Sequence, residues 1–235
     1  MQDTPETPGT GGPDPMGAPP PPPPAPPSAS TTAVGPRKGV FDRARDMIVR
    51  PAAEWQVIDS EPATVGSVFV PYALLLAAIG PIASLIGGQL FGYNLGFIVL
   101  KPPLGAAIAG AVISYVMSLV SVFVLALIID ALAPTFGGTK NQVNAVKVAV
   151  YSSTAAWLAG IFGIIPALAI LGILGLYSLY LLYLGLPVVM KAPKDKAVGY
   201  TVVVILAAIV LWMIVGFIVA SLTYSMWGPA IPRIG

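Results

Sequence analysis

Long apolar stretches alternate with short polar segments along most of this chain. A helix needs about 20 residues to cross a hydrocarbon core of about 30 Å. Five stretches after residue 61 meet that length, over residues 65–90, 104–129, 143–162, 164–187 and 197–222. The pattern predicts an all-α, polytopic membrane protein in which residues 62–226 form a bundle of five transmembrane helices.

The third and fourth predicted spans come from one uncharged block. No Asp, Glu, Lys or Arg lies between Lys147 and Lys191, and that block is too long for a single crossing. Gly160, Gly163 and Pro166 mark the plausible turn within it, because glycine and proline interrupt helices. We therefore expect a helical hairpin on either side of this turn.

Composition supports the membrane class and narrows the chemistry. Charged residues make up 9% of the chain, against about a quarter in a typical soluble domain. The 235 residues include no cysteine and no histidine, which excludes disulfides, thiolate nucleophiles, histidine-ligated metals and Ser-His-Asp triads within the chain. Ser152 has only Lys147 as a nearby candidate base, too weak a pattern for a protease. We expect no enzymatic activity, no cofactor and no nucleic-acid partner.

The first 36 residues differ from the rest. They include an unbroken proline block at residues 19–24 and no apolar run that could serve as a signal peptide. Such a segment buries too little apolar surface to offset its ordering entropy. We expect a disordered, proline-rich cytoplasmic tail, with docking to an SH3-like domain as the alternative.

Residues 37–61 form a basic, amphipathic juxtamembrane segment. Phe41, Ile48 and Trp55 are seven residues apart and would share one face of a continuous helix, although Pro51 should interrupt it. The segment is expected to lie in the headgroup region and to bind anionic lipid. The candidate headgroup ligands are Arg37, Lys38, Arg43, Arg45, Arg50 and Trp55. The alternative, compatible with it, is that these charges only fix the topology.

The orientation follows from the basic residues. With the N-terminus in the cytoplasm, the tail, the second loop and the fourth loop hold ten of the twelve Lys and Arg residues. Only Lys101 and Arg233 then lie outside. The positive-inside rule favours this orientation. We predict a multi-pass protein of a bacterial inner (plasma) membrane, with a cytoplasmic N-terminus and an external C-terminus.

Two polar features within the spans are open to more than one interpretation. Asp130 and Lys147 sit at span ends, where they are either a functional pair or ordinary interface charges. Tyr177, Tyr180 and Tyr183 recur every three residues. We expect at least two of their hydroxyls to face other helices, and a polar cavity lining is the alternative.

Several motifs in order along the chain are similar to the Yip domain family, the Ypt/Rab-interacting proteins, in its prokaryotic branch. They are Pro51-x-x-x-Trp55-x-x-Ile58, Tyr151-Ser152-Ser153-Thr154 with Trp157-Leu158-Ala159-Gly160, then Pro166, Tyr177-x-x-Tyr180-x-x-Tyr183-x-Gly185-Leu186-Pro187 and Lys191-x-Pro193-x-x-Lys196. Ala155 stands where family members usually have a proline, so a kink there would be absent or shallower.

The resemblance implies a five-helix bundle with a cytoplasmic N-terminus. It favours a non-enzymatic protein that organises membrane, or binds partner proteins and lipids. A homo-oligomer is a further possible assembly. Its eukaryotic relatives act in vesicle traffic and bind small GTPases, but no residue here matches such a contact. The alternative function is a small transporter, channel or lipid-handling protein. Its polar path would use Ser114, Ser118, Ser121, Ser152, Thr154 and Ser178.

Overall fold

The computed structural model describes residues 38–94 and 99–227. Arg37 and the proline-rich tail lie outside the described residues, so the predictions for them remain predictions. Nearly all of the described chain is helical. A short antiparallel pair, β1 (Tyr93–Asn94) and β2 (Val99–Leu100), joins the first two spans.

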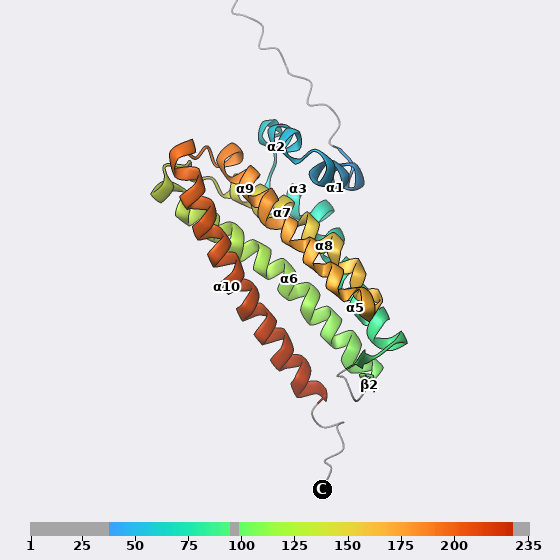
Figure 1. Cartoon of the computed structure of the whole chain (residues 1–235). Coiled ribbons are helices and arrows are strands. Elements are labelled where there is room, and N and C mark those ends of the chain that lie inside the picture. The colour runs from blue at the N-terminus through green and yellow to red at the C-terminus, as the bar shows by residue number, and fades with distance from the viewer. Residues whose placement is uncertain (1–37, 95–98, 228–235) are drawn as a thin grey trace, which may run out of the picture. The chain divides into compact units, whose positions relative to one another are not determined.

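The helices follow one another with few connecting residues (Figure 1). Before the first span lie α1 (Val40–Val49) and α2 (Pro51–Ser60). The first two spans consist of α3 (Val65–Val68), the π-helix η1 (Phe69–Ala73), α4 (Leu74–Ala77) and α5 (Ile79–Leu90), then α6 (Leu104–Leu132) and the 3₁₀ helix η2 (Ala133–Phe136). The last three consist of α7 (Gln142–Ser152), α8 (Thr154–Ala159) and η3 (Gly160–Ile164), then η4 (Pro166–Leu176) and α9 (Tyr177–Val189), then α10 (Lys194–Trp227).

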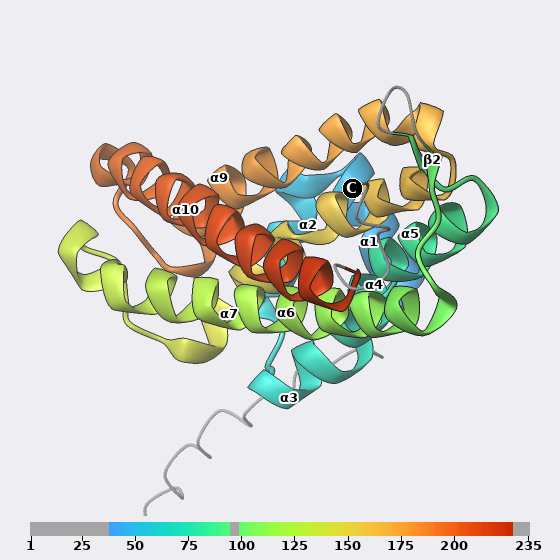
Figure 2. The same ribbon diagram turned by 90° about the horizontal axis from the view of Figure 1, so that it is seen from below.

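Five helical stretches in the described residues are long and apolar enough to cross a membrane. They cover Val65–Leu90, Leu104–Phe136, Gln142–Ile164, Pro166–Val189 and Asp195–Thr223. The number and order of the predicted spans are confirmed, and the second one extends to Phe136 rather than to residue 129. In an apolar 18-residue window of the third stretch 67% of the residues are buried, against 6% in such a window of the last. The third is therefore the centre of the bundle, while α10 lies at its edge beside α6 (Figures 1 and 2).

Local sequence explains two interruptions of the spans. Pro71 has no N–H to donate, and the helix around it widens into the π-turn η1. The third span is interrupted at Ser153, although Ala155 replaces the expected proline. The Ser153 hydroxyl donates a hydrogen bond of 2.8 Å to the carbonyl of Ala149. Such back-bonding bends helices, so a discontinuity is present without the proline.

Glycines let the first and third spans approach closely. A Cβ atom on Gly160 would lie 2.7 Å from the Cα atom of Gly80, and one on Gly87 would lie 2.4 Å from the carbonyl oxygen of Gly163. No side chain fits at these contacts. Small residues at such crossings are what allow transmembrane helices to pack against each other, because the bilayer provides no hydrophobic drive between them.

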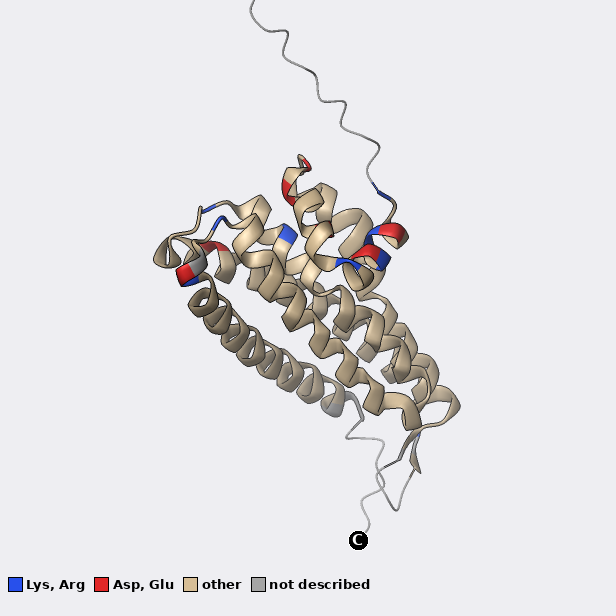
Figure 3. Cartoon of the chain, turned by 45° about the horizontal axis from the view of Figure 1, so that its top comes forward, with Lys and Arg blue, Asp and Glu red and all other residues tan. Residues whose placement is uncertain are grey.

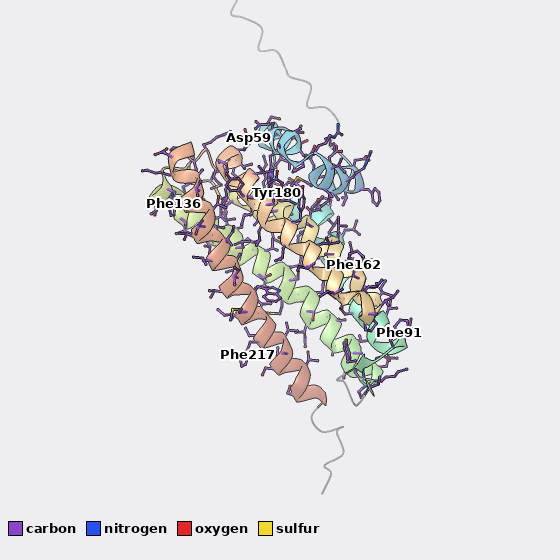
Figure 4. The ribbon with its side chains drawn as sticks, in the orientation of Figure 1. Asp59, Phe91, Phe136, Phe162, Tyr180 and Phe217 are labelled. Atoms are coloured by element: carbon purple, nitrogen blue, oxygen red, sulfur yellow. The ribbon has the colours of Figure 1, made fainter. Side chains whose placement is uncertain are left out.

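The main core lies at the end of the bundle that carries α1 and α2. Its largest fully buried side chains include Trp55, Tyr200, Met47, Ile58 and Ile129. At the other end most large side chains face outward. Phe217 on α10, for example, is 76% exposed and projects away from the other helices (Figure 4).

Candidate functional site

Charged residues gather at the end of the bundle that carries α1 and α2 (Figure 3). We call residues 38–61 the cap. Its two helices are separated at Arg50, which leaves the helical region with φ −138° and ψ 53°. Pro51 then opens α2 at its first position, where a missing N–H is harmless. The cap is therefore a pair of short helices and not one continuous amphipathic helix.

This break corrects the predicted apolar face. Phe41 is 87% exposed, whereas Trp55 is fully buried. The two side chains do not share a face, because the chain turns between them at Arg50. The heptad spacing predicted a common face only on the assumption of an unbroken helix.

A buried ion-pair cluster joins the two cap helices to each other. The Arg43 guanidinium donates to Glu54 Oε1 at 2.7 Å and to Glu61 Oε1 at 2.6 Å. The side chains of Arg43 and Glu54 are 4% and 3% exposed. The guanidinium carbon also lies 5.5 Å from the centre of the Tyr151 ring, a cation–π contact with the third span. Arg43 thus links α1, α2 and the bundle.

A second group of ion pairs surrounds Asp46. Lys38 Nζ lies 2.9 Å from Asp46 Oδ2 and 2.6 Å from Glu54 Oε2, and Arg50 Nη2 lies 2.9 Å from Asp46 Oδ1. The hydrogen bonds from Lys38, and next from Arg50, lower the pKa of Asp46 to about 2 from its ordinary 3.8. The same carboxylates raise the pKa of Lys38. Each of these pKa shifts favours the charged form, the carboxylate of Asp46 and the ammonium group of Lys38.

Lys147 attaches the C-terminal end of α2 to the third span. Its Nζ donates to the carbonyl oxygens of Ile58 at 2.8 Å and Glu61 at 2.6 Å. The residue is 4% exposed. Carbonyls at the end of a helix have no partner within it, and a cation there is favourable. Lys147, which the sequence analysis assigned to the end of a span, therefore caps the C-terminal end of α2 and is buried.

Asp130 does not pair with Lys147. Its Oδ1 is buried and has no hydrogen-bond partner among the described residues. The interpretation as a facing pair is wrong, because the ammonium group of Lys147 is already bound to the end of α2. Asp130 follows Ile129, whose carbonyl accepts a hydrogen bond from the hydroxyl of Tyr200 on α10.

The fourth span also binds the cap. The Tyr177 hydroxyl donates to the carbonyl of Ile48 at 3.2 Å, and Lys191 forms an ion pair with Asp59. Figure 4 shows Asp59 on α2 at the charged end of the bundle. The cap is thus held by side chains from the third and fourth spans and by Lys191, which follows the fourth span.

The tyrosine row is only partly as predicted. Tyr177 makes the bond to Ile48, and its ring centre lies 5.3 Å from that of Tyr180. Tyr180 and Tyr183 are 47% and 45% exposed. Of the three hydroxyls, only that of Tyr177 has a hydrogen bond to another helix among the described residues, because a three-residue spacing rotates the later tyrosines away from the cap.

The remaining family-motif residues occupy structural positions. Tyr151 is buried beneath Arg43, with its ring against Tyr72. Trp157 donates its indole N–H to the Ser118 hydroxyl at 3.1 Å. Pro166 opens η4, and Pro187 lies inside α9. Lys196 is exposed near the start of α10.

The headgroup candidates divide into two groups. Arg43 and Trp55 are buried and cannot reach lipid in this conformation, so their assignment is corrected. Lys38 is exposed, but its ammonium group is paired with the carboxylates of Asp46 and Glu54. Arg45 and Arg50 remain at the exposed surface. Arg43 is bound by acidic side chains of the same segment, and Trp55 packs against Gly185 on α9.

Sequence reasoning missed those acidic partners. Asp46, Glu54, Asp59 and Glu61 accept every cap ion pair described above. One signal was available: Asp46 and Arg50 are four residues apart, the spacing of a helical ion pair. The other pairs are separated by eight or more residues, and no helical spacing indicates them.

The described residues include no cluster of three or more metal-ligating side chains. Among comparisons with known proteins, no curated protein and no solved structure matches the chain. The Yip1 domain, as a family, matches residues 45–215, which include most of the cap and nearly all of the five spans. The chain therefore belongs to the Yip1 domain family.

Proposed function

We propose that this protein is a non-enzymatic membrane organiser of the Yip type, whose cap is a fixed platform at the cytoplasmic surface for anionic lipid and partner proteins. The observation that carries the proposal is the attachment of the cap. Its two helices are bound to each other by the Arg43–Glu54 pair and to the bundle by Lys147 and Tyr177. A segment held in this way presents one constant surface.

The distribution of charge supports a cytoplasmic position for the cap. At the cap end lie the basic residues Lys38, Arg43, Arg45, Arg50, Lys140, Lys147, Lys191, Lys194 and Lys196. Lys101 lies at the opposite end, beside the β1–β2 pair. The positive-inside rule then places the cap in the cytoplasm. We extend this to a bacterial plasma membrane and to the prokaryotic branch of the family, as the resemblance implies.

The outer face of α1 has the character of an interfacial helix. Phe41, Arg45 and Val49 are exposed and follow one another at four-residue intervals, so they share one face. Apolar groups that enter the headgroup region together with a basic group bind anionic membranes. Each well-placed basic residue contributes about 1 kcal/mol near such a surface. Asp42 is exposed as well, so the expected attraction is modest.

The transport alternative needs a polar path through the spans. Several of the hydroxyls that would form it are bound within the protein: Ser121 donates to the Ser118 carbonyl at 2.8 Å, and Thr154 donates to the Tyr151 carbonyl at 2.6 Å. Hydroxyls engaged in this way are ordinary means of packing transmembrane helices. We therefore favour the organising function.

The test is lipid retention by the purified full-length protein. We expect native mass spectrometry to find anionic phospholipid bound in preference to zwitterionic lipid, and Arg45→Gln combined with Phe41→Ser to reduce that preference. Lys101→Gln is the matched control, since it removes a basic residue at the other end. Equal retention by the cap variant and the control would contradict the proposal.

A further inference from the structure

Two grooves open between the spans, away from the cap, and meet at one tryptophan. The first has a volume of about 510 Å³ and lies among α5, α6 and α10. The second, of about 580 Å³, lies among α6, η4, α9 and α10. Ser118, Ala156 and Trp157 line both. Together they form a channel-like recess along the inner side of α10, within the apolar spans.

The hydroxyl groups that line the second groove are mostly bonded within the protein. The Ser118 hydroxyl accepts the Trp157 indole N–H at 3.1 Å. The Ser178 hydroxyl accepts the backbone N–H of Ala156 at 2.9 Å. Ser152 and Ser153 both donate to the carbonyl of Ala149. Water or an ion in the second groove would thus find few free partners, and a dry cavity takes apolar ligands. The first groove is more polar, because Ser114 and Thr223 also line it.

The lining carries no Asp, Glu, Lys or Arg in either groove. Gly172 and Gly175 belong to the wall that the fourth span gives to the second groove, and a Cβ atom on Gly172 would meet nothing within 4 Å. The opposite wall is α10, whose Trp212 is 75% exposed at the edge of the second groove. A recess that is uncharged and lies among the apolar spans suits a hydrocarbon chain.

We propose that this recess binds one lipid acyl chain, which enters laterally past α10 and lies against Trp157. The ligand is a membrane lipid recognised by its chain, and the site is distinct from the headgroup surface of the cap. The charge of the lining supports a hydrocarbon occupant over an ion or a polar solute. A second copy of the protein fits less well, because a helix about 10 Å wide cannot enter a recess bounded by α6, α9 and α10.

The test measures Trp157 fluorescence in vesicles of phospholipid brominated on the acyl chain. The full-length protein carries Trp212→Phe and Trp227→Phe, and the same protein with Trp157→Phe supplies the background from Trp55. We expect brominated lipid to quench Trp157. Acrylamide, a water-soluble quencher, should have little effect.

A matched pair of variants locates the quenching lipid. Gly172→Leu adds a side chain inside the second groove, and Gly216→Leu adds the same side chain on α10, where a Cβ atom also meets nothing within 4 Å. Gly172→Leu should reduce the quenching of Trp157, while Gly216→Leu should leave it unchanged. Unchanged quenching in Gly172→Leu would overturn the proposal. Stronger quenching by acrylamide than by brominated lipid would also overturn it and would show a hydrated recess.

Discussion

Trp55 on α2 lies directly against Gly185 on α9. A Cβ atom on Gly185 would come within 2.5 Å of Trp55 Cζ2 and within 2.7 Å of Cε2. Trp55 is fully buried there. The cap and the fourth span therefore depend on each other's residue types, since the indole needs a glycine opposite it.

Gly185→Ala should loosen the cap. Alanine favours a helix interior over glycine by about 1 kcal/mol, yet here the added methyl group meets the indole ring, and overpacking costs about 1–3 kcal/mol. We expect a lower melting temperature in detergent and faster hydrogen exchange in α2. Gly199→Ala is the control, because its nearest neighbour, Phe136 Cε1, is 3.5 Å away. Equal melting temperatures for the two variants would contradict the contact.

Arg43→Gln should be among the most destabilising substitutions in the cap. Removal of one partner from a buried ion pair costs about 3–5 kcal/mol, because the other charge stays buried. Glu54 would keep only Lys38 as an ionic partner. Arg45→Gln, at an exposed position of the same helix, should change the free energy of unfolding by less than about 0.5 kcal/mol. Chemical unfolding in mild detergent compares them.

Lys147→Met should release the end of α2 while the rest of the bundle stays folded. Methionine has a similar apolar stem but no donor, so the carbonyls of Ile58 and Glu61 lose their partner. Each unsatisfied buried group costs about 1–3 kcal/mol. Hydrogen exchange should rise in residues 58–64 and stay unchanged in α6. Uniform exchange throughout the protein would show that Lys147 has a different role.

The cap should weaken in acid within a defined range. The pKa of Asp46 is about 2 in the folded protein, against 3.8 ordinarily. A lowered folded-state pKa means that its contribution to stability is complete above about pH 4 and is lost as the pH falls through 2. Asp46→Asn should remove this part of the pH dependence of α1 hydrogen exchange. The same acid profile in wild type and variant would contradict it.

The five spans could be predicted from sequence because hydropathy alone determines which segments enter a bilayer. The hairpin turn followed from Gly160 and Pro166 for the same local reason. The cap could be predicted only as an amphipathic basic segment. Its structure depends on the departure of Arg50 from the helix and on the position of Glu54 beside Arg43 across two helices. Neither is visible in a periodic pattern.

The polar residues of the spans show the same limit. Lys147 and Asp130 were both identified as boundary charges, but which atom each faces depends on how the helices are rotated and packed. The sequence placed them near each other along the chain, while the structure binds Lys147 to the carbonyl ends of α2. Contacts between segments more than eighty residues apart are set by tertiary packing.

The most direct test of the account is the side of the membrane on which the cap lies. The chain has no cysteine, so single cysteines can be introduced at Gln56 on the exposed surface of the cap and at Lys101 at the opposite end. A membrane-impermeant maleimide should label Lys101→Cys in intact cells. It should label Gln56→Cys only after the membrane is opened. Labelling of Gln56→Cys in intact cells would contradict a cytoplasmic platform.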